Sequence, residues 1–446
     1  MTRLAFDIGG TFTDFALTDP ATGETRVWKV PTTPDAPARA VLESLTAAVR
    51  AGELAPATLT AVLHATTTAT NAILERKGAR VALITTEGFR DILLIGRQKR
   101  PDTNDLHMDK PAPLTSRADI LTVPERMAPD GGVVTPLDET AACAIADRIA
   151  AEGYDAAAIV FLHAYANPAH EQAMARILAD RAPGVDISLS SVISPKFREY
   201  ERTSTTVANA YVKPTVSSYI AALERSLSGL GIGAGLSIMQ SNGGLVSAAL
   251  AREWPIRIVE SGPAAGVIMC AQLGQEEGFA HVMTFDMGGT TAKLGAVPPP
   301  FEVDTVNFRR GSGLPLNVMA IELLEIGAGG GSIARNKMGL ITVGPDSAGA
   351  QPGPICYGNG GTEPTITDAN LVLGYLNPDY FNGGAMRLNA AAAAEGISRQ
   401  IGAPLGLTLH DAAWGIHRIA NTNMERAMRL VSIERGRDPR RYALVA

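Results

Sequence analysis

Cysteine is scarce in this sequence, and its positions exclude two kinds of site. Three cysteines occur in 446 residues, far apart at Cys143, Cys270 and Cys356. No C-x-x-C pair is present, so neither a disulfide framework nor a zinc site built from cysteines is expected. This cysteine usage is typical of a protein of the reducing cytoplasm.

Long apolar runs and long basic runs are also missing. No apolar stretch reaches the roughly 18 residues that a membrane-spanning helix needs, and a strand expected from about Leu4 leaves no room for a signal peptide. The formal net charge is −6, and the basic stretch 97–100 is short. We therefore expect neither nucleic acid nor a membrane as the main partner.

Several familiar catalytic motifs are absent as well. The sequence contains no G-x-x-x-x-G-K loop and no G-x-S-x-G elbow, and its seven histidines are scattered. His170 and Glu171 open like a zinc-protease helix, but Met174 stands where the second histidine is needed. A serine triad or a self-contained hydrolytic zinc site is therefore not expected. Apolar residues make up 46% and aromatic residues 5%, which is ordinary for an α/β enzyme of two or three domains.

One motif occurs twice. Phe-Asp-Ile-Gly-Gly-Thr at 6–11 matches Phe-Asp-Met-Gly-Gly-Thr at 285–290, 279 positions further on (286 minus 7). Each copy ends an apolar run that reads as a strand, which predicts a tight hairpin at its end. Glycines without Cβ atoms let backbone N–H groups close on a phosphate, and the threonine hydroxyl adds a donor. Two such hairpins predict two similar halves facing one nucleotide, with its phosphates bound by Gly9, Gly10, Thr11, Gly288, Gly289 and Thr290.

The two aspartates of the repeated motif are the predicted metal ligands. Asp7 and Asp286 each offer hard carboxylate oxygens to Mg²⁺, usually through its water shell. The copies then diverge, because Thr13 and Asp14 follow the first motif whereas Lys293 stands at the place of Asp14 in the second. We expect one hairpin to bind the metal ion and its water, and the other to contact an anionic oxygen directly. A solvated strand residue is an equally good interpretation of Lys293. The predicted catalytic set is Asp7, Asp286, Thr13, Asp14 and Lys293.

Two glycine-rich segments are candidates for anion binding. The loop 327–332 lacks the dinucleotide-binding spacing, because Ser332 stands where the third glycine is needed. A backbone nest for ribose or phosphate formed by Gly329, Gly330 and Gly331 remains a reasonable alternative. The stretch 261–266 opens a helix whose N-terminus could hold an anion.

Three polar residues are further candidates for contact with the substrate. His64 and Asn71 flank a threonine-rich helix start, where helix capping is the competing interpretation. Arg97 begins a basic segment that could approach an anionic intermediate, and a solvated loop is the alternative there.

Alternating helix and strand signals predict a mainly parallel sheet covered by helices. We expect two domains, 1–200 and 201–446, each with one phosphate hairpin, and a long loop or inserted segment near 96–136. Pro214 should kink or divide a long helix at 203–230, and 256–259 should be a short strand. The apolar run 441–446 should begin a core strand, so a longer polypeptide or a second chain is expected to complete that sheet.

Together these residues resemble the hydantoinase A/oxoprolinase family, which belongs to the actin-like, sugar-kinase-like ATPase superfamily. The resemblance covers nearly the whole chain, through the two hairpin motifs and through 64–71, 75–78, 198–202, 239–244, 261–267, 327–334, 347–350, 352–354 and 367–370. It implies an α/β fold of two RNase H-like halves with mixed sheets and flanking helices. It also implies ATP and Mg²⁺ as cofactors.

The activity implied by this resemblance is ATP-dependent opening of a cyclic amide. An A-type subunit would phosphorylate the amide or carbonyl oxygen, mainly by positioning and charge neutralisation, together with a hydantoinase B-type subunit. Lys293 stands where the oxoprolinase-like pattern has aspartate, which favours the hydantoinase branch or the ketone carboxylase branch. Family chains also continue past the equivalent of Ala446 into a glycine-rich turn expected to contact adenosine.

Two other functions fit the same motifs. A sugar or acetate kinase would transfer phosphate to a hydroxyl or carboxylate and accumulate a phosphorylated product. A non-catalytic ATP-binding module would instead use the nucleotide to act on a partner protein.

Overall fold

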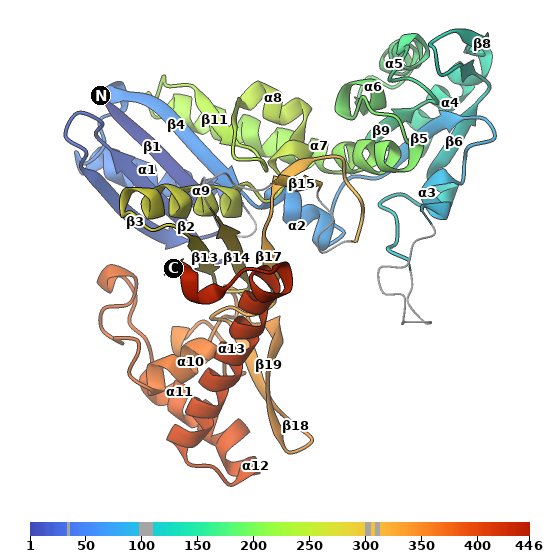
Figure 1. Cartoon of the computed structure of the whole chain (residues 1–446). Helices are drawn as coiled ribbons and strands as arrows, with labels where there is room; N and C mark the ends of the chain where they lie inside the picture. The colour runs from blue at the N-terminus through green and yellow to red at the C-terminus, as the bar shows by residue number, and fades with distance from the viewer. Residues whose placement is uncertain (34–35, 98–109, 299–304, 308–312) are drawn as a thin grey trace.

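Two of the three larger sheets begin with the repeated motif. The computed structural model describes residues 1–33, 36–97, 110–298, 305–307 and 313–446 (Figure 1). The first sheet has the strand order β12-β11-β4-β1-β2-β3, with the bounds β1 (Thr2–Ile8), β2 (Phe12–Thr18), β3 (Thr25–Pro31), β4 (Leu59–Thr66), β11 (Leu236–Met239) and β12 (Leu245–Ser247). The second has the order β17-β14-β13-β20, with the bounds β13 (Val282–Met287), β14 (Ala292–Val297), β17 (Leu324–Ile326) and β20 (Ala443–Val445).

The two sheets repeat one pattern of strand pairing. β1 and β2 form an antiparallel hairpin, and β4 joins β1 in parallel. In the same way, β13 and β14 form an antiparallel hairpin, and β20 joins β13 in parallel. The two copies of the motif therefore begin two structurally similar halves, as the sequence predicts.

Helices cover the two sheets differently. One face of the first sheet packs on α1 (Pro37–Arg50) and α7 (Glu199–Gly229), in a core that includes Leu4, Phe15 and Leu45. The second sheet is covered on both faces. α13 (Leu409–Val431) packs on Met283 and Leu294, and α9 (Ser261–Glu276) packs on the opposite face.

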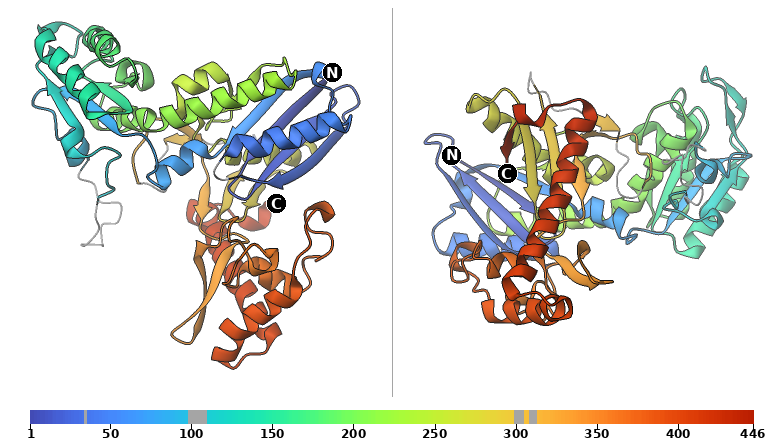
Figure 2. Two further views of the ribbon diagram at one scale, coloured as in Figure 1. Left: turned by 180° about the vertical axis from the view of Figure 1, so that it is seen from behind. Right: turned by 60° about the horizontal axis from the view of Figure 1, so that its bottom comes forward.

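The third sheet forms a separate lobe that α7 joins to the first sheet (Figures 1 and 2). Its order is β10-β9-β5-β6, and all its pairs are parallel. Its elements are β5 (Val81–Thr86), β6 (Ile120–Val123), β9 (Ala156–Val160), β10 (Asp186–Leu189), α4 (Glu139–Glu152), α5 (Ala169–Arg181) and α6 (Ser190–Ile193). Of the two alternatives predicted for 96–136, a long loop does not fit the second part, because β6 and the hairpin of β7 (Arg126–Met127) and β8 (Val133–Thr135) lie within it; an inserted segment stays a prediction. Strands of two to four residues are too short to show a hydrophobic period. Residues 98–109 lie outside the described part.

A further lobe lies between β17 and α13 in the sequence and hangs below the second sheet in Figure 1. Its elements are β18 (Ser332–Lys337), β19 (Leu340–Ser347), α10 (Ile366–Val372), α11 (Ala390–Ile397) and α12 (Ala403–Leu405). The remaining elements are α2 (Thr68–Leu74), α3 (Ile92–Ile95), α8 (Ala248–Glu253), β15 (Thr305–Asn307) and β16 (Met319–Ile321).

The expected division of a long helix and one expected strand are wrong. α7 is not divided at Pro214 and runs as one helix from Glu199 to Gly229, because its apolar residues are buried along the helix on both sides of the proline. Such packing outweighs the local cost of a proline. The stretch Pro255–Ile258 is a 3₁₀ helix rather than a strand.

The first sheet also contains strands from later in the chain. Strands β11 and β12 lie after residue 200 and pair into this sheet.

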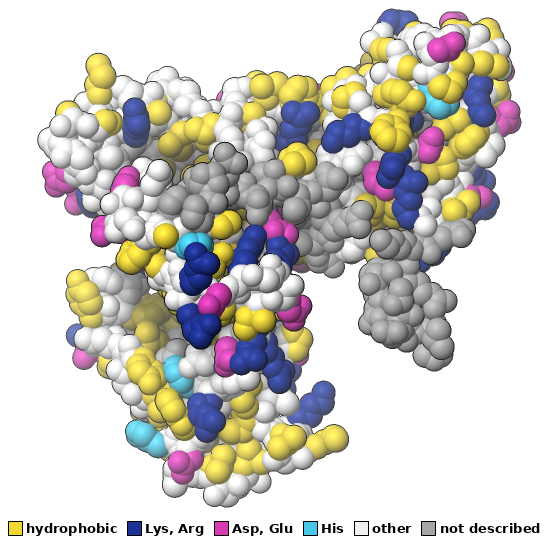
Figure 3. Space-filling view, viewed as in Figure 1, with side chains coloured by type: hydrophobic (Ala, Val, Ile, Leu, Met, Phe, Trp, Pro, Cys, Tyr) yellow, Lys and Arg dark blue, Asp and Glu magenta, His cyan; other side chains and the backbone are white. Residues whose placement is uncertain are grey.

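Two surface properties bear on partners. On the face shown in Figure 3, Lys and Arg side chains are interspersed with Asp and Glu side chains. Within the described residues, every helix falls short of the length or the hydropathy that crossing a membrane would take.

Candidate functional site

The tips of the two hairpins touch. Gly9 N–H donates to Phe12 O at 3.0 Å, and Gly288 N–H donates to Thr291 O at 3.0 Å, so the two turns are closed alike. A Cβ atom added at Gly289 would lie 2.3 Å from Thr11 Oγ1. The structure thus brings the two glycine-rich turns to one place between the halves.

Four backbone donors lie on these turns. Within the described residues, the N–H groups of Gly10, Thr11, Gly289 and Thr290 have no backbone acceptor. Consecutive N–H groups in a turn without an internal acceptor form a concave surface that favours anions. The arrangement is chemically suited to the oxygens of a phosphate chain.

Charged side chains surround the carboxylate of Asp7. Asp7 on β1 pairs with Asp14 on β2, and Asp286 on β13 pairs with Lys293 on β14, so the two halves place different charges at equivalent positions. Burial raises the pKa of Asp7 to about 6; the Lys293 ammonium opposes this rise, while the charges of Asp14 and Asp286 add to it. Four of the five predicted catalytic residues therefore lie within electrostatic reach of one another.

Thr13, the fifth residue, points elsewhere. It is buried, and its Oγ1 lies 3.1 Å from Thr32 Oγ1. Successive residues of a strand face opposite sides of the sheet, so Thr13 faces away from the side that carries Asp14. Its expected catalytic role is corrected to a structural one.

The carboxylates fit a hydrated divalent cation better than a dehydrated one. Asp7 Oδ1 is buried and has no hydrogen-bond partner in the described part of the chain, and an unsatisfied buried carboxylate oxygen calls for a cation or a donor. No three His, Cys, Asp or Glu side chains among the described residues form a direct ligand cluster. Mg²⁺ keeps several waters when it binds proteins, and Asp7, Asp14 and Asp286 suit contact through that water shell.

The glycine loop 327–332 braces the second hairpin. Gly330 N–H donates to Gly288 O at 3.0 Å, and Gly331 N–H donates to Gly289 O at 2.7 Å. A Cβ atom at Gly329 would lie 2.6 Å from the carbonyl carbon of Gly289. The predicted open nest is therefore corrected, because the amides of Gly330 and Gly331 are engaged by the hairpin, and Gly329 and Gly331 allow the loop to pack closely on it.

The start of α9, where the sequence predicts a helix N-terminus able to hold an anion, lies at the site. A Cβ atom at Gly262 would lie 2.8 Å from Asp7 Oδ1, so α9 begins directly beside this carboxylate. Ser261 Oγ accepts from Thr66 N–H at 2.9 Å and donates to Thr66 O at 3.0 Å, which fixes the helix start to the end of β4. Buried Glu260 has φ 62°, a rare conformation for a residue with a side chain. The small residues at 261–266 were the only signal in the sequence.

His64 is a core residue. Its Nε2 lies 2.7 Å from Tyr219 Oη of α7, its Nδ1 lies 3.2 Å from Phe6 O, and its ring stacks on Phe6. Burial lowers the pKa of His64 to about 4, so the ring is neutral at pH 7. Both nitrogens are engaged on the helix-covered side of the sheet, which corrects the expected contact with substrate.

Arg97 and Asn71 differ in their surroundings. Arg97 Nε donates to Glu201 Oε1 at 2.8 Å, and its Nη2 donates to Glu201 Oε2. This two-point pairing ties Arg97 to the start of α7 and corrects the expectation that it is available to an anionic intermediate. Asn71 is exposed, and its amide donates to Thr67 Oγ1 at 3.3 Å. Its role as a substrate contact stays a prediction.

Two similar α/β halves whose glycine-rich hairpins face one another define the actin-like, sugar-kinase-like ATPase fold, as the sequence predicts. The chain belongs to the hydantoinase/oxoprolinase family. The family model described as Hydantoinase/oxoprolinase matches residues 202–446, and the model of the Hydantoinase/oxoprolinase N-terminal region matches residues 3–182. The resemblance expected from the motifs is confirmed.

Three relatives show the extent of the similarity. The chain is 38% identical to caprolactamase subunit alpha of Pseudomonas jessenii, over 99% of this chain and 64% of that protein. It is 36% identical to the acetophenone carboxylase gamma subunit of Aromatoleum aromaticum, over 99% of this chain and 62% of that protein. Nucleotide-free acetone carboxylase superposes with a TM-score of 0.87 at 28% identity, over 99% of this chain and 64% of that one. The chain thus spans somewhat less than two thirds of the length of these relatives.

The contact between hairpins can be tested by a double-mutant cycle. Gly289→Ala should lower the free energy of unfolding by about 1–3 kcal/mol, because the new methyl group overlaps Thr11 Oγ1. Thr11→Ala should restore part of this loss, since it removes the overlapping atom. Urea unfolding of the two single variants, the double variant and the parent measures the coupling. Gly288→Ala is the matched control, because its nearest neighbour would be Thr291 O at 3.8 Å. Additive effects at 11 and 289 would contradict the contact.

The buried carboxylate predicts a specific pH dependence. The pKa of Asp7 is raised in the folded state to about 6, so ionising it destabilises the fold as pH rises from about 4 to about 6. In metal-free buffer, Asp7→Asn should therefore be more stable than the parent at pH 7, by up to about 3 kcal/mol. The two proteins should converge toward pH 4. Urea unfolding across this range is the measurement, and a pH-independent difference would argue against a buried Asp7.

Proposed function

We propose that this chain is the ATP-binding subunit of an enzyme that phosphorylates the oxygen of a cyclic amide and thereby drives ring-opening hydrolysis. The observation that carries the proposal is the meeting of the two hairpin tips beside Asp7, Asp14, Asp286 and Lys293. Phosphoryl transfer needs little covalent chemistry from the protein and much positioning and charge neutralisation, and this site offers both.

The residues take separate roles in the proposed reaction. The amides of Gly10, Thr11, Gly289 and Thr290 hold phosphate oxygens, and Gly9 and Gly288 close the turns. Asp7, Asp14 and Asp286 orient the water shell of Mg²⁺. The Lys293 ammonium neutralises charge on the transferred group. When bound, ATP and Mg²⁺ supply the phosphoryl group and a Lewis-acid charge.

The relatives support an amide or a ketone as the substrate. Caprolactamase is named for a cyclic amide, and acetone and acetophenone carboxylases are named for ketones. Ring opening is our first choice, because the identity to caprolactamase subunit alpha is the higher. Ketone carboxylation is the second candidate, which the TM-score of 0.87 with acetone carboxylase supports.

We also propose a second subunit and a cytoplasmic location. The relatives are printed as an alpha and a gamma subunit, which supports an assembly, and a hydantoinase B-type chain is the proposed partner. The use of ATP and three cysteines outside any disulfide support the cytoplasm.

Substrate-dependent phosphate release tests the proposal. The chain is combined with a B-type subunit and with any region needed to complete it, and is given ATP and Mg²⁺ with lactams, hydantoins, or a ketone plus bicarbonate. A lactam or hydantoin should release free phosphate together with the ring-opened acid. Asp286→Asn should lower that rate by on the order of 10²-fold, because it removes a negative charge from the cation site. Asp19→Asn, in the exposed turn after β2, should leave the rate unchanged.

The rival functions give other results in the same assay. A stable phosphorylated product would indicate a sugar or acetate kinase. ATP-dependent partner binding without turnover of any small substrate would indicate a non-catalytic module. Phosphate release only with a ketone and bicarbonate would favour the carboxylase.

A further inference from the structure

The two glycine-rich turns are braced by different groups. In the second hairpin, a backbone amide of the loop 327–332 holds the turn, because Gly330 N–H donates to Gly288 O at 3.0 Å. The equivalent of Gly288 in the first hairpin is Gly9, 279 positions earlier (288 minus 9). There a side chain holds the carbonyl: Thr32, the residue after β3, donates its hydroxyl to Gly9 O at 2.9 Å.

Holding this carbonyl fixes the direction of an amide of the site. A trans peptide unit is planar and carries its C=O and its N–H on opposite sides. Gly9 O and Gly10 N–H belong to one such unit, so the bond to Gly9 O turns the Gly10 N–H away from Thr32. In the second hairpin, the brace on Gly288 O fixes the N–H of Gly289 in the same way. Both of these amides are among the four donors without a backbone acceptor in the described residues.

The peptide unit between Gly9 and Gly10 needs such a brace. Glycine adopts positive and negative φ about equally readily, so a unit between two glycines turns over at little steric cost. A Cβ atom at Gly10 would meet nothing within 4 Å in the described part of the chain, so packing does not restrict the unit either. Turned over, it would present an oxygen to a phosphate in place of an N–H group. Thr32 also holds the other side of Gly10, because its own N–H donates to Thr11 O at 2.9 Å.

Thr13 supports the hydroxyl of Thr32. The two Oγ1 atoms lie 3.1 Å apart. A hydroxyl carries one hydrogen, and Thr32 uses its hydrogen on Gly9 O, so Thr13 is the donor in this pair. Accepting a hydrogen bond strengthens the bond that a hydroxyl donates. The equivalent of Thr13 in the second hairpin is Ala292 (13 plus 279), which has no hydroxyl. The hydroxyl pair therefore belongs to the first hairpin alone.

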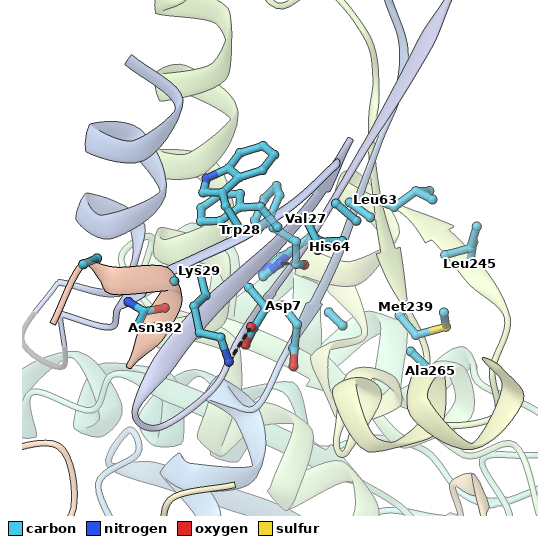
Figure 4. A pocket seen from close by; sticks show the side chains of 18 residues that line it. Asp7, Val27, Trp28, Lys29, Leu63, His64, Met239, Leu245, Ala265 and Asn382 are labelled. Carbon is cyan, nitrogen blue, oxygen red and sulfur yellow. Dashed lines mark hydrogen bonds and ion pairs between the residues drawn. The ribbon is translucent and has the colours of Figure 1, made fainter. Parts of the chain in front are cut away.

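Both hydroxyls act on the turn from the side opposite the carboxylates. Asp7, Asp14 and Lys29 line a cavity of about 920 Å³ on one face of the first sheet (Figure 4). Thr13 is the neighbour of Asp14 in β2 and is buried on the other face. Because the Thr32 hydroxyl meets Thr13 there, neither hydroxyl is placed to contact a phosphate. Their effect on a ligand passes through the Gly10 amide.

We propose that Thr32 is a positioning residue of the phosphate site. Its hydroxyl, supported by Thr13, holds the peptide between Gly9 and Gly10 so that the Gly10 N–H faces the phosphate chain of a nucleoside triphosphate. This inference rests on the proposed function, because it assigns Thr32 to the same site. It makes the affinity for ATP depend on a hydroxyl that ATP does not touch.

Binding of a non-hydrolysable ATP analogue with Mg²⁺ tests the proposal without any turnover. The assembled complex of the phosphate-release assay is titrated by calorimetry. Thr32→Val keeps the branched shape but removes the donor, and should weaken binding about tenfold or more, as expected for one hydrogen bond to a charged group. Thr32→Ser keeps the hydroxyl and should bind within about twofold of the parent. Thr13→Val should give a smaller loss in the same direction, because the brace itself remains.

A second pair of threonines supplies the matched control. Thr18 and Thr25 are paired between the same two strands, β2 and β3, at the end away from the turn, and their Oγ1 atoms lie 3.0 Å apart. Thr25→Val removes the same kind of hydroxyl contact as Thr32→Val. It should leave the binding of the analogue unchanged.

Two results would overturn the proposal. Equal binding by Thr32→Val and Thr25→Val would do so even if the parent opens lactams, and the proposed function would then stand alone. An equal loss in Thr32→Ser and Thr32→Val would assign the effect to packing of the methyl group. A loss confined to Thr32→Val and, more weakly, Thr13→Val supports the proposal even if no cyclic amide is turned over. Urea unfolding of each variant identifies a folding defect, and Thr13→Val decides the matter if Thr32→Val does not fold.

Discussion

The close approach of two backbone turns is the constraint on which the rest of this structure depends. Gly289 has no side chain where it meets Thr11 Oγ1, and Gly329 has none where it meets the backbone of Gly289. Any larger residue at these points would separate the hairpins or detach the loop that braces the second one. Because the tips meet, four backbone donors from two distant parts of the chain face one small volume.

Charge around this volume is arranged asymmetrically. The first half contributes the carboxylates of Asp7 and Asp14, whereas the second contributes the Asp286 carboxylate and the Lys293 ammonium. Burial and the neighbouring carboxylates raise the pKa of Asp7, and Lys293 partly offsets them. Without a metal, the ionised carboxylate of Asp7 is destabilised by burial and by repulsion from the neighbouring carboxylates. A hydrated divalent cation would offset this repulsion. In the proposed function, this difference in charge on similar backbones would let one half hold the cation and the other contact the transferred group.

The two halves differ in what packs on their sheets. The second sheet packs against α13 on one face and against α9 on the opposite face. The first sheet packs against α1 and α7 on one face, and its opposite face forms one wall of the cavity beside Asp7 and Asp14, which Ala265 of α9 also lines. The packed face of the first sheet and the face that carries Asp7 and Asp14 are thus formed by residues that alternate along β1 and β2.

The sequence by itself determined the features that depend on local chemistry. The repeated Asp-x-Gly-Gly-Thr motif predicted both hairpins, and alternating patterns predicted an α/β fold with strands and helices such as β4, α4, β9 and α13, because turn formation and strand pattern depend on neighbouring residues. Tertiary structure decided the rest. It buried His64 against Tyr219, paired Arg97 with Glu201, used the amides of Gly330 and Gly331 to brace a hairpin, and placed the start of α9 beside Asp7. Each of these outcomes depends on a contact between residues far apart in the chain, which local pattern does not encode.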